Sequence, residues 1–246
     1  MPHDYLPFFF IVSAIFFGAG MVKGVLGLGL PTLAMGLLGL LMPIPQAASL
    51  LTLPSLVTNL WQAFAGGAFG PLVRRLATFQ LGIVAGVAGA SLLPPLQDPL
   101  GRILLGGCLL AYGLSGAAGW RIAPLSPRVE VFAGPLAGAA TGLATGVTGV
   151  FVLPAVPYLQ ALALDRNQLA QSLGLSFTTS TLALACLLAA RGALDLTTST
   201  HSALSVVPAL AGMWIGQKIR EELGEAAFRK CFFLGMVLLG GWLLAS

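Results

Sequence analysis

Charged residues are scarce in this sequence of 246 residues. Only 8% of the residues are Asp, Glu, Lys or Arg, whereas 57% are hydrophobic and the mean hydropathy is +0.93. A water-soluble domain of this length would need much more polar surface. The composition therefore excludes a soluble globular protein and predicts an all-α integral membrane protein, with residues 1–246 forming a single transmembrane domain.

Residue types that serve catalysis or metal binding are also few. The chain has two histidines and three cysteines, and Cys108, Cys186 and Cys231 lie in apolar segments without the spacing of metal ligands. The eight carboxylates fall in or beside expected loops, and intramembrane hydrolysis needs a nucleophile with a base or a metal. We therefore expect no enzymatic activity, no metal and no cofactor. The net charge of +4 lies mainly in loops, and we expect no nucleic-acid partner.

Glycine, in contrast, is abundant, with 32 residues, and its arrangement is repeated. Each half of the chain has a glycine series that leads to a proline: Gly20, Gly24, Gly27 and Gly29 before Pro31, and Gly138, Gly142, Gly146 and Gly149 before Pro154. Further along, residues 46–59 align with residues 168–181, and both stretches end in polar side chains. Two similar halves in an apolar chain are typical of secondary transporters, whose binding site lies where paired, interrupted helices meet.

The apolar stretches predict about five helical segments in each half, or about eight to ten transmembrane segments in total. The second segment of each half, residues 30–43 and residues 150–164, is shorter than the roughly 20 residues that a spanning helix requires. We therefore expect the first two segments of each half to form a broken or re-entrant hairpin.

The basic residues predict the topology, because Lys and Arg in short loops favour the cytoplasm. Four groups of basic residues are expected on the cytoplasmic side. They are an Arg74–Arg75 loop, the stretch from Arg121 to Arg128, the single residue Arg166, and the basic residues from 218 to 230. An odd number of segments per half makes the halves inverted repeats: repeat A over residues 6–120, a cytoplasmic linker over residues 121–129 and repeat B over residues 130–246. Both termini are then periplasmic.

The glycine-to-proline breaks are candidate anion sites, since a helix that restarts there directs free N–H groups and its positive dipole end at the break. The residues proposed for substrate binding at the breaks are Gly27, Gly29, Pro31, Thr32, Gly146, Thr148, Gly149 and Pro154. The alternative interpretation is that the glycines only allow helices to pack closely.

Polar side chains on the helices that follow the breaks provide further candidate donors to an anion. These residues are Thr58, Asn59, Trp61 and Gln62 in the first half and Thr178, Thr179, Ser180 and Thr181 in the second. They could instead serve only as interhelical hydrogen-bonding groups. Lys23 is the one charged residue well inside an apolar stretch; it is either a countercharge for the anion or extends to the interface.

The sequence resembles the sulfite exporter TauE/SafE family, also called the 4-toluene sulfonate uptake permease family. The resemblance rests on residues 24–31, on Leu53 and Pro54 followed by residues 58–62, and on residues 142–154. It implies a multi-pass protein of the cell inner membrane that transports small sulfur-containing anions such as sulfite or organosulfonates. This sequence lacks the triple-glycine run that is usual in the family, having one residue between Gly27 and Gly29.

We expect transport by alternating access, with the anion held between the two breaks and the two polar faces. The expected partners are this anion and the lipid bilayer, and the sequence leaves open a coupling ion (proton or sodium) and a homo-oligomer. An anion channel, a non-transporting membrane enzyme and an assembly subunit are the alternative functions.

Overall fold

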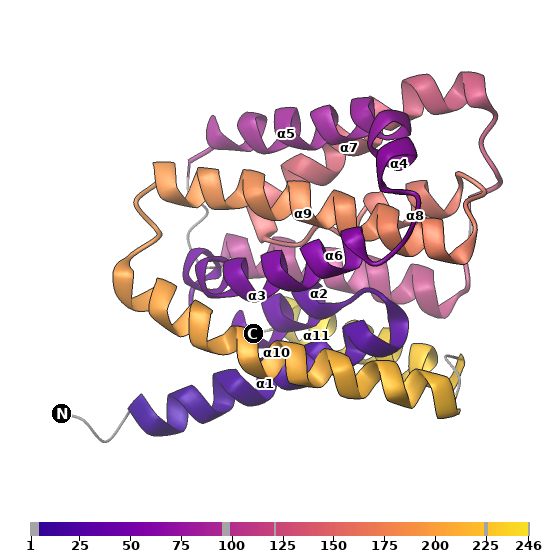
Figure 1. The fold of residues 1–246 in the computed structure, drawn as a ribbon. Coiled ribbons are helices and arrows are strands. Elements are labelled where there is room, and N and C mark those ends of the chain that lie inside the picture. The colour runs from indigo at the N-terminus through magenta and orange to yellow at the C-terminus, as the bar shows by residue number, and fades with distance from the viewer. Residues whose placement is uncertain (1–4, 95–98, 121, 224–225, 246) are drawn as a thin grey trace.

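The computed structural model describes residues 5–94, 99–120, 122–223 and 226–245, and every element in this part of the chain is a helix. The helices run predominantly along one direction of the molecule (Figure 1). Their bounds are α1 (Tyr5–Leu26), α2 (Leu30–Leu38), α3 (Ile44–Phe64), α4 (Phe69–Arg75), α5 (Ala77–Ser91), α6 (Leu100–Ala117), α7 (Pro127–Thr148), α8 (Ala155–Gln160), α9 (Arg166–Ala190), α10 (Leu196–Leu223) and α11 (Ala226–Ala245).

Five helices in the described residues are long and apolar enough to cross a membrane: α1, α6, α7, α9 and α11. The pair α4 and α5 adds a sixth candidate span, bent by 63° at a single residue between the two helices. Helices α3 and α10, with 21 and 28 residues, are long enough to span but carry more polar side chains. The all-α membrane fold is thus confirmed, while the larger count of about eight to ten segments stays a prediction.

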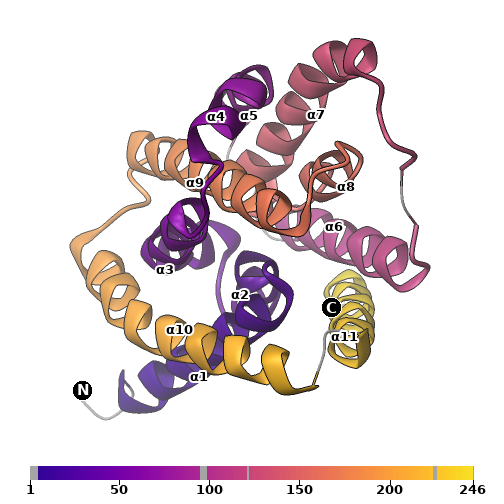
Figure 2. The same ribbon diagram turned by 45° about the vertical axis from the view of Figure 1, so that its right-hand side comes forward.

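Helices from the two halves of the chain pack against one another in pairs. Helix α1 packs along α10, α7 along α5, α3 along α9 and α6 along α11 (Figure 2). The first helix of each half, α1 or α7, therefore packs on the next-to-last helix of the other half, α10 or α5. The hydrophobic core is shared between the halves, which do not form separate units.

The first glycines of each series allow this close packing. A Cβ atom on Gly24 would lie 2.2 Å from the carbonyl oxygen of Met213 on α10, and one on Gly142 would lie 2.0 Å from that of Ile83 on α5. Helices can approach this closely only where a residue has no side chain. The packing interpretation therefore holds for these positions, and for Gly20 and Gly138, which contact the same two partner helices.

The last glycines of each series have a different role, because they interrupt the helices. Gly27 (φ +73°) and Gly29 (φ +104°) lie between α1 and α2, and Gly149 (φ +71°) follows α7. These backbone conformations favour glycine, since a Cβ atom is strained there. The two predicted breaks are present, and the helices that follow them, α2 and α8, have only nine and six residues.

One loop prediction was wrong: Arg74 and Arg75 form the last turn of helix α4. Arg75 makes a bidentate ion pair with Glu130 on α7, with both N–O distances at 2.8 Å. Basic side chains at a helix C-terminus are favoured by the helix dipole, which helps to keep both arginines helical. The chain instead bends at Leu76, between α4 and α5.

The basic residues expected on one side of the membrane gather at one end of the helix bundle. This basic end contains the C-termini of α4 and α10 and the N-termini of α7, α9 and α11, and lies at the right in Figure 1. Its arginines and lysines are Arg74, Arg75, Arg128, Arg166, Lys218, Arg220, Arg229 and Lys230. Arg121 belongs to the same predicted group and lies outside the described residues.

Candidate functional site

Lys23 lies in the last turn of α1 with its side chain 3% exposed. Its Nζ atom donates hydrogen bonds to Thr58 Oγ1, at 3.3 Å, and to Asn59 Oδ1, both on α3. The side chain therefore turns toward a neighbouring helix and does not extend to the interface. This geometry does not agree with a side chain that extends to the interface, and a role of Lys23 in anion binding stays a prediction.

A hydrogen-bonded cluster behind Lys23 holds Asn59 in place and joins α3 to α9. Asn59 Nδ2 donates to Ser55 Oγ at 3.0 Å and to Thr181 Oγ1 at 3.4 Å, and the Ser55 and Thr181 hydroxyl oxygens are 3.1 Å apart. With both amide hydrogens used in this way, the Asn59 oxygen is left to accept from Lys23. All four side chains are buried, so the cluster fixes the position of the ammonium group.

The positive charge of Lys23 has no carboxylate partner among the described residues, where the single salt bridge joins Arg75 and Glu130. A lysine ammonium has three N–H donors, and two of them are used by Asn59 and Thr58. A buried cation without a countercharge is unfavourable. An anion beside Lys23 would supply the missing charge and accept the third hydrogen bond.

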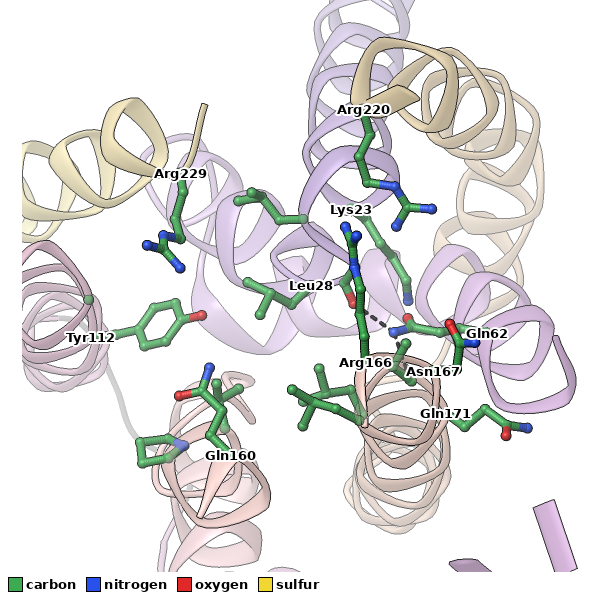
Figure 3. A pocket seen from close by; sticks show the side chains of 18 of the residues that line it. Lys23, Leu28, Gln62, Tyr112, Gln160, Arg166, Asn167, Gln171, Arg220 and Arg229 are labelled. Atoms are coloured by element: carbon green, nitrogen blue, oxygen red, sulfur yellow. Dashed lines mark hydrogen bonds between the residues drawn. The ribbon is translucent and has the colours of Figure 1, made fainter. Parts of the chain in front are cut away.

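Lys23 also lines a large cavity at the basic end, with a volume of about 1080 Å³. Figure 3 shows polar and basic side chains that project into it from several helices. None of the described residues that line it is Asp or Glu. Its labelled polar lining residues are Lys23, Gln62, Tyr112, Gln160, Arg166, Asn167, Gln171, Arg220 and Arg229. A cavity with this lining favours an anion over a cation.

Gln62 connects the first break to helix α9 at the edge of this cavity. Its Nε2 atom donates to the carbonyl oxygens of Gly27, at 2.7 Å, and Ala170, at 2.9 Å. The Gly27 carbonyl is freed by the helix break, so the glutamine satisfies a backbone group that would otherwise lack a partner. The Gln62 Oε1 atom is buried and has no hydrogen-bond partner among the described residues.

The structure separates the proposed binding residues into three groups. Lys23, Gly27, Trp61 and Gln62 line the cavity, and Thr58, Asn59 and Thr181 lie in or beside the cluster that holds Lys23. The remaining candidates do not line the cavity: Gly29, Pro31, Thr32, Gly146, Thr148, Gly149, Pro154, Thr178, Thr179 and Ser180. Their role in binding stays a prediction.

Several of these remaining hydroxyls are occupied within their own helix. Thr178 donates to the Gly174 carbonyl at 2.8 Å and Thr148 to the Ala144 carbonyl at 2.8 Å, while Thr179 bonds less closely in the same way. In contrast, the buried hydroxyl groups of Thr32 and Ser180 have no hydrogen-bond partner in the described part of the chain.

The second break lies in the packed core and not in the cavity. A Cβ atom on Gly149 would lie 2.8 Å from Met35 Cε on α2, and residues 150–152 are fully buried. Phe151 packs on Phe177 of α9, with ring centroids 5.2 Å apart. In this conformation the two breaks have unequal surroundings: one opens to the cavity and the other is closed.

Sequence reasoning missed the cavity residues from the more distant helices. Arg166, Arg220 and Arg229 served only as indicators of topology, and Tyr112 and Gln160 were not singled out. Four of the missed residues occupy helix ends next to loops, where basic and polar residues are common in any membrane protein. These residues are Arg166, Arg220, Gln160 and Arg229. One feature of the sequence could have identified these four residues: they lie on the same predicted cytoplasmic side as Lys23.

Comparison with known proteins decides the family. The family model for the sulfite exporter TauE/SafE matches residues 12–243, which is nearly the whole chain. The protein belongs to the sulfite exporter TauE/SafE family. The resemblance seen in the glycine and proline motifs is thus confirmed, and so is a multi-pass membrane protein of a transporter family. Neither the curated proteins nor the solved structures gave a match to this chain.

Proposed function

We propose that this TauE/SafE family member is a secondary transporter that moves small sulfur-containing anions, such as sulfite or organosulfonates, across the inner membrane. The observation that carries the proposal is Lys23, a buried cation that lines a cationic cavity and has no protein countercharge in the described residues. An intramembrane charge of this kind is costly to maintain and marks a site of function.

The cavity suits a small oxyanion for chemical reasons. The oxygens of sulfite and sulfonate groups accept hydrogen bonds from ammonium and guanidinium donors, and such charge-assisted bonds are stronger than neutral ones. Arg166 and Arg220 line the same cavity, and Figure 3 shows both side chains directed toward the region of Lys23. A cleft of one charge sign raises the local concentration of the opposite ion and its rate of entry.

Alternating access is supported by the relation between the halves. Asn59 and Thr181 stand 122 positions apart, the offset that aligns residues 46–59 with residues 168–181, and they bond to each other. Equivalent residues meet in this way near a twofold axis, so we propose inverted repeats A (6–120) and B (130–246). In the opposite state the cavity would close at the basic end and open beside the second break.

The topology is part of the same proposal. The basic end faces the cytoplasm, which makes the cavity inward-open and both termini periplasmic. An anion channel would need a continuous path through the protein. The hydrogen bonds that join Ser55 and Asn59 to Thr181, and the packing of Gly149 against Met35, favour a closed periplasmic side and therefore a transporter.

A thermal-shift screen of the purified full-length protein tests the proposal. Sulfite, sulfate, thiosulfate and several sulfonates are compared with chloride at equal ionic strength. A bound anion stabilises the folded state by mass action, about 2.7 kcal/mol at 100 times its Kd. We expect at least one sulfur oxyanion to raise the Tm with a saturating dose dependence, and no such rise in Lys23→Met. A screen in which no sulfur anion exceeds chloride would overturn the proposed substrate class.

A further inference from the structure

The cavity has a second polar region, away from Lys23, that the proposed function does not use. It is formed by Tyr112 on α6, Gln160 at the end of α8 and Arg229 on α11, all of which line the cavity. We call these three residues the distal lobe. Figure 3 shows the Tyr112 hydroxyl pointing into the cavity, with the Arg229 guanidinium on one side and the Gln160 amide on the other.

Tyr112 is the most informative residue of the distal lobe. Its side chain is 3% exposed, and its hydroxyl is buried without a hydrogen-bond partner among the described residues. Edge-to-face contacts with Phe232 and Phe233, at centroid distances of 6.2 and 5.3 Å, hold the ring in this orientation. A buried hydroxyl without a partner is unfavourable, so a donor held in this way indicates a ligand that accepts its hydrogen bond.

Apolar side chains separate the distal lobe from Lys23. In Figure 3, Leu28 lies between Tyr112 on one side and Lys23 with Gln62 on the other. Leu173 and Val156 also line the cavity. The lining therefore has three successive regions. The first is cationic, the second is apolar, and the third contains a hydroxyl donor and a second cation. The volume of about 1080 Å³ also exceeds what one sulfite ion would fill, since cavities of roughly 300–1,000 Å³ hold drug-sized ligands.

We propose that the preferred substrate is an organic anion with two acidic groups joined by a short aliphatic spacer. One acidic group binds at Lys23, the spacer lies against Leu28, and the second acidic group accepts hydrogen bonds from Tyr112 and Arg229. A planar guanidinium suits either a sulfonate or a carboxylate at this end. This inference deepens the proposed function and rests on it.

The charge of the distal lobe also predicts which ligand is rejected. No Asp or Glu among the described residues lines the cavity, so an ammonium group has no countercharge there. An aminoalkanesulfonate would place its positive charge beside the like charge of Arg229. A charge of the same sign in the site is one way in which a protein rejects a competing ligand.

Isothermal titration calorimetry on the full-length protein tests the inference with ligands of matched length. The probes are ethane-1,2-disulfonate, ethanesulfonate and 2-aminoethanesulfonate, with sulfoacetate and succinate to compare sulfonate and carboxylate ends. We expect the disulfonate to bind roughly tenfold or more tightly than ethanesulfonate, because a hydrogen bond to a charged group is gained. We expect 2-aminoethanesulfonate to bind no better than ethanesulfonate.

Two variants assign the effect to the distal lobe. Tyr112→Phe should weaken the disulfonate about tenfold and leave ethanesulfonate within twofold of wild type. Tyr158→Phe is the matched control, because Tyr158 stacks on Phe79 outside the cavity lining and should change neither affinity. Arg229→Gln should also reduce the preference for the disulfonate, whereas Arg74→Gln, which removes an exposed charge at the same end, should not.

The outcomes separate this inference from the proposed function. Equal affinities for the disulfonate and ethanesulfonate would refute a substrate with two acidic groups. The same conclusion would follow if Tyr112→Phe weakened both ligands equally and Arg229→Gln changed neither affinity. In both cases single anions would still bind at Lys23, and the proposed function would stand. If no anion binds at all, the proposed function fails as well. Should Tyr112→Phe elute as an aggregate, the Arg229→Gln and Arg74→Gln pair decides the question alone.

Discussion

The Asn59 side chain on α3 donates a hydrogen bond to Thr181 on α9, and the two residues occupy equivalent positions in the two halves of the sequence. The same asparagine accepts a hydrogen bond from Lys23. One side chain thus connects the buried cation of the cavity to the contact between the halves. In the proposed mechanism, a change at the anion site and a change at the contact between α3 and α9 are coupled through Asn59.

Lys23→Met should weaken anion binding roughly tenfold or more, because a charged hydrogen bond contributes about 1.5–3 kcal/mol. Lys23→Arg should restore only part of the affinity, since a planar guanidinium does not match the positions of Thr58 and Asn59. Lys218→Met is the control: Lys218 lies 3.9 Å from the Trp214 ring centroid and does not line the cavity. A titration in which Lys23→Met matches wild type within twofold would remove Lys23 from the site.

Gly24→Ala should reduce stability by about 1–3 kcal/mol, the usual cost of overpacking a close contact. The new Cβ atom would collide with the Met213 carbonyl, which lies 2.2 Å from its position, and α1 would move away from α10. Gly18→Ala on the same helix is the control, because nothing lies within 4 Å of its Cβ position. Thermal unfolding in detergent compares the two variants, and equal Tm values would contradict the role assigned to Gly24.

Gly27→Ala tests whether the first break itself serves transport. Its φ of +73° strains alanine by about 1–2 kcal/mol, although the nearest atom to the new Cβ is 3.9 Å away. Gly192→Ala carries similar strain, at φ +67°, in a loop at the opposite end of the bundle. We expect a similar loss of stability in both variants and a marked loss of flux only in Gly27→Ala. Normal flux in Gly27→Ala would mean that the break has a packing role alone.

The helix breaks were predictable because their causes are local. Gly27, Gly29 and Gly149 adopt positive φ angles that glycine favours, and Pro31 follows one residue into the next helix. The membrane class likewise follows from composition alone. The buried Lys23 was recognised because a charge within an apolar stretch stands out in the sequence, although its partners Thr58 and Asn59 lie 35 and 36 positions away.

Features that depend on tertiary packing were not predictable. The bend at Leu76 has no glycine or proline at that position, and the helical state of Arg75 depends on an ion pair with Glu130, 55 residues further along. Tyr112 is an ordinary aromatic residue in an apolar helix. Only the folded chain shows that its hydroxyl is buried without a partner at the cavity.

Labelling of single cysteines tests the topology. Ser126→Cys, on a background that lacks Cys108, Cys186 and Cys231, places an exposed thiol at the basic end. Because that end is assigned to the cytoplasm, an impermeant reagent should not label it in intact cells and should label it after lysis. Thr197→Cys, exposed at the opposite end, should show the reverse accessibility. Labelling of position 126 from outside would refute the inverted arrangement.

Counterflow in proteoliposomes is the most direct test of the central claim that an anion bound at Lys23 is carried by alternating access. Vesicles are loaded with a high concentration of the sulfur anion selected in the thermal-shift screen and diluted into a trace of the radiolabelled anion. The account predicts that the label accumulates transiently above its external concentration, that this uptake saturates, and that Lys23→Met abolishes it while Lys218→Met does not. Flux that only equilibrates the label without overshoot and does not saturate would show a channel and contradict the account.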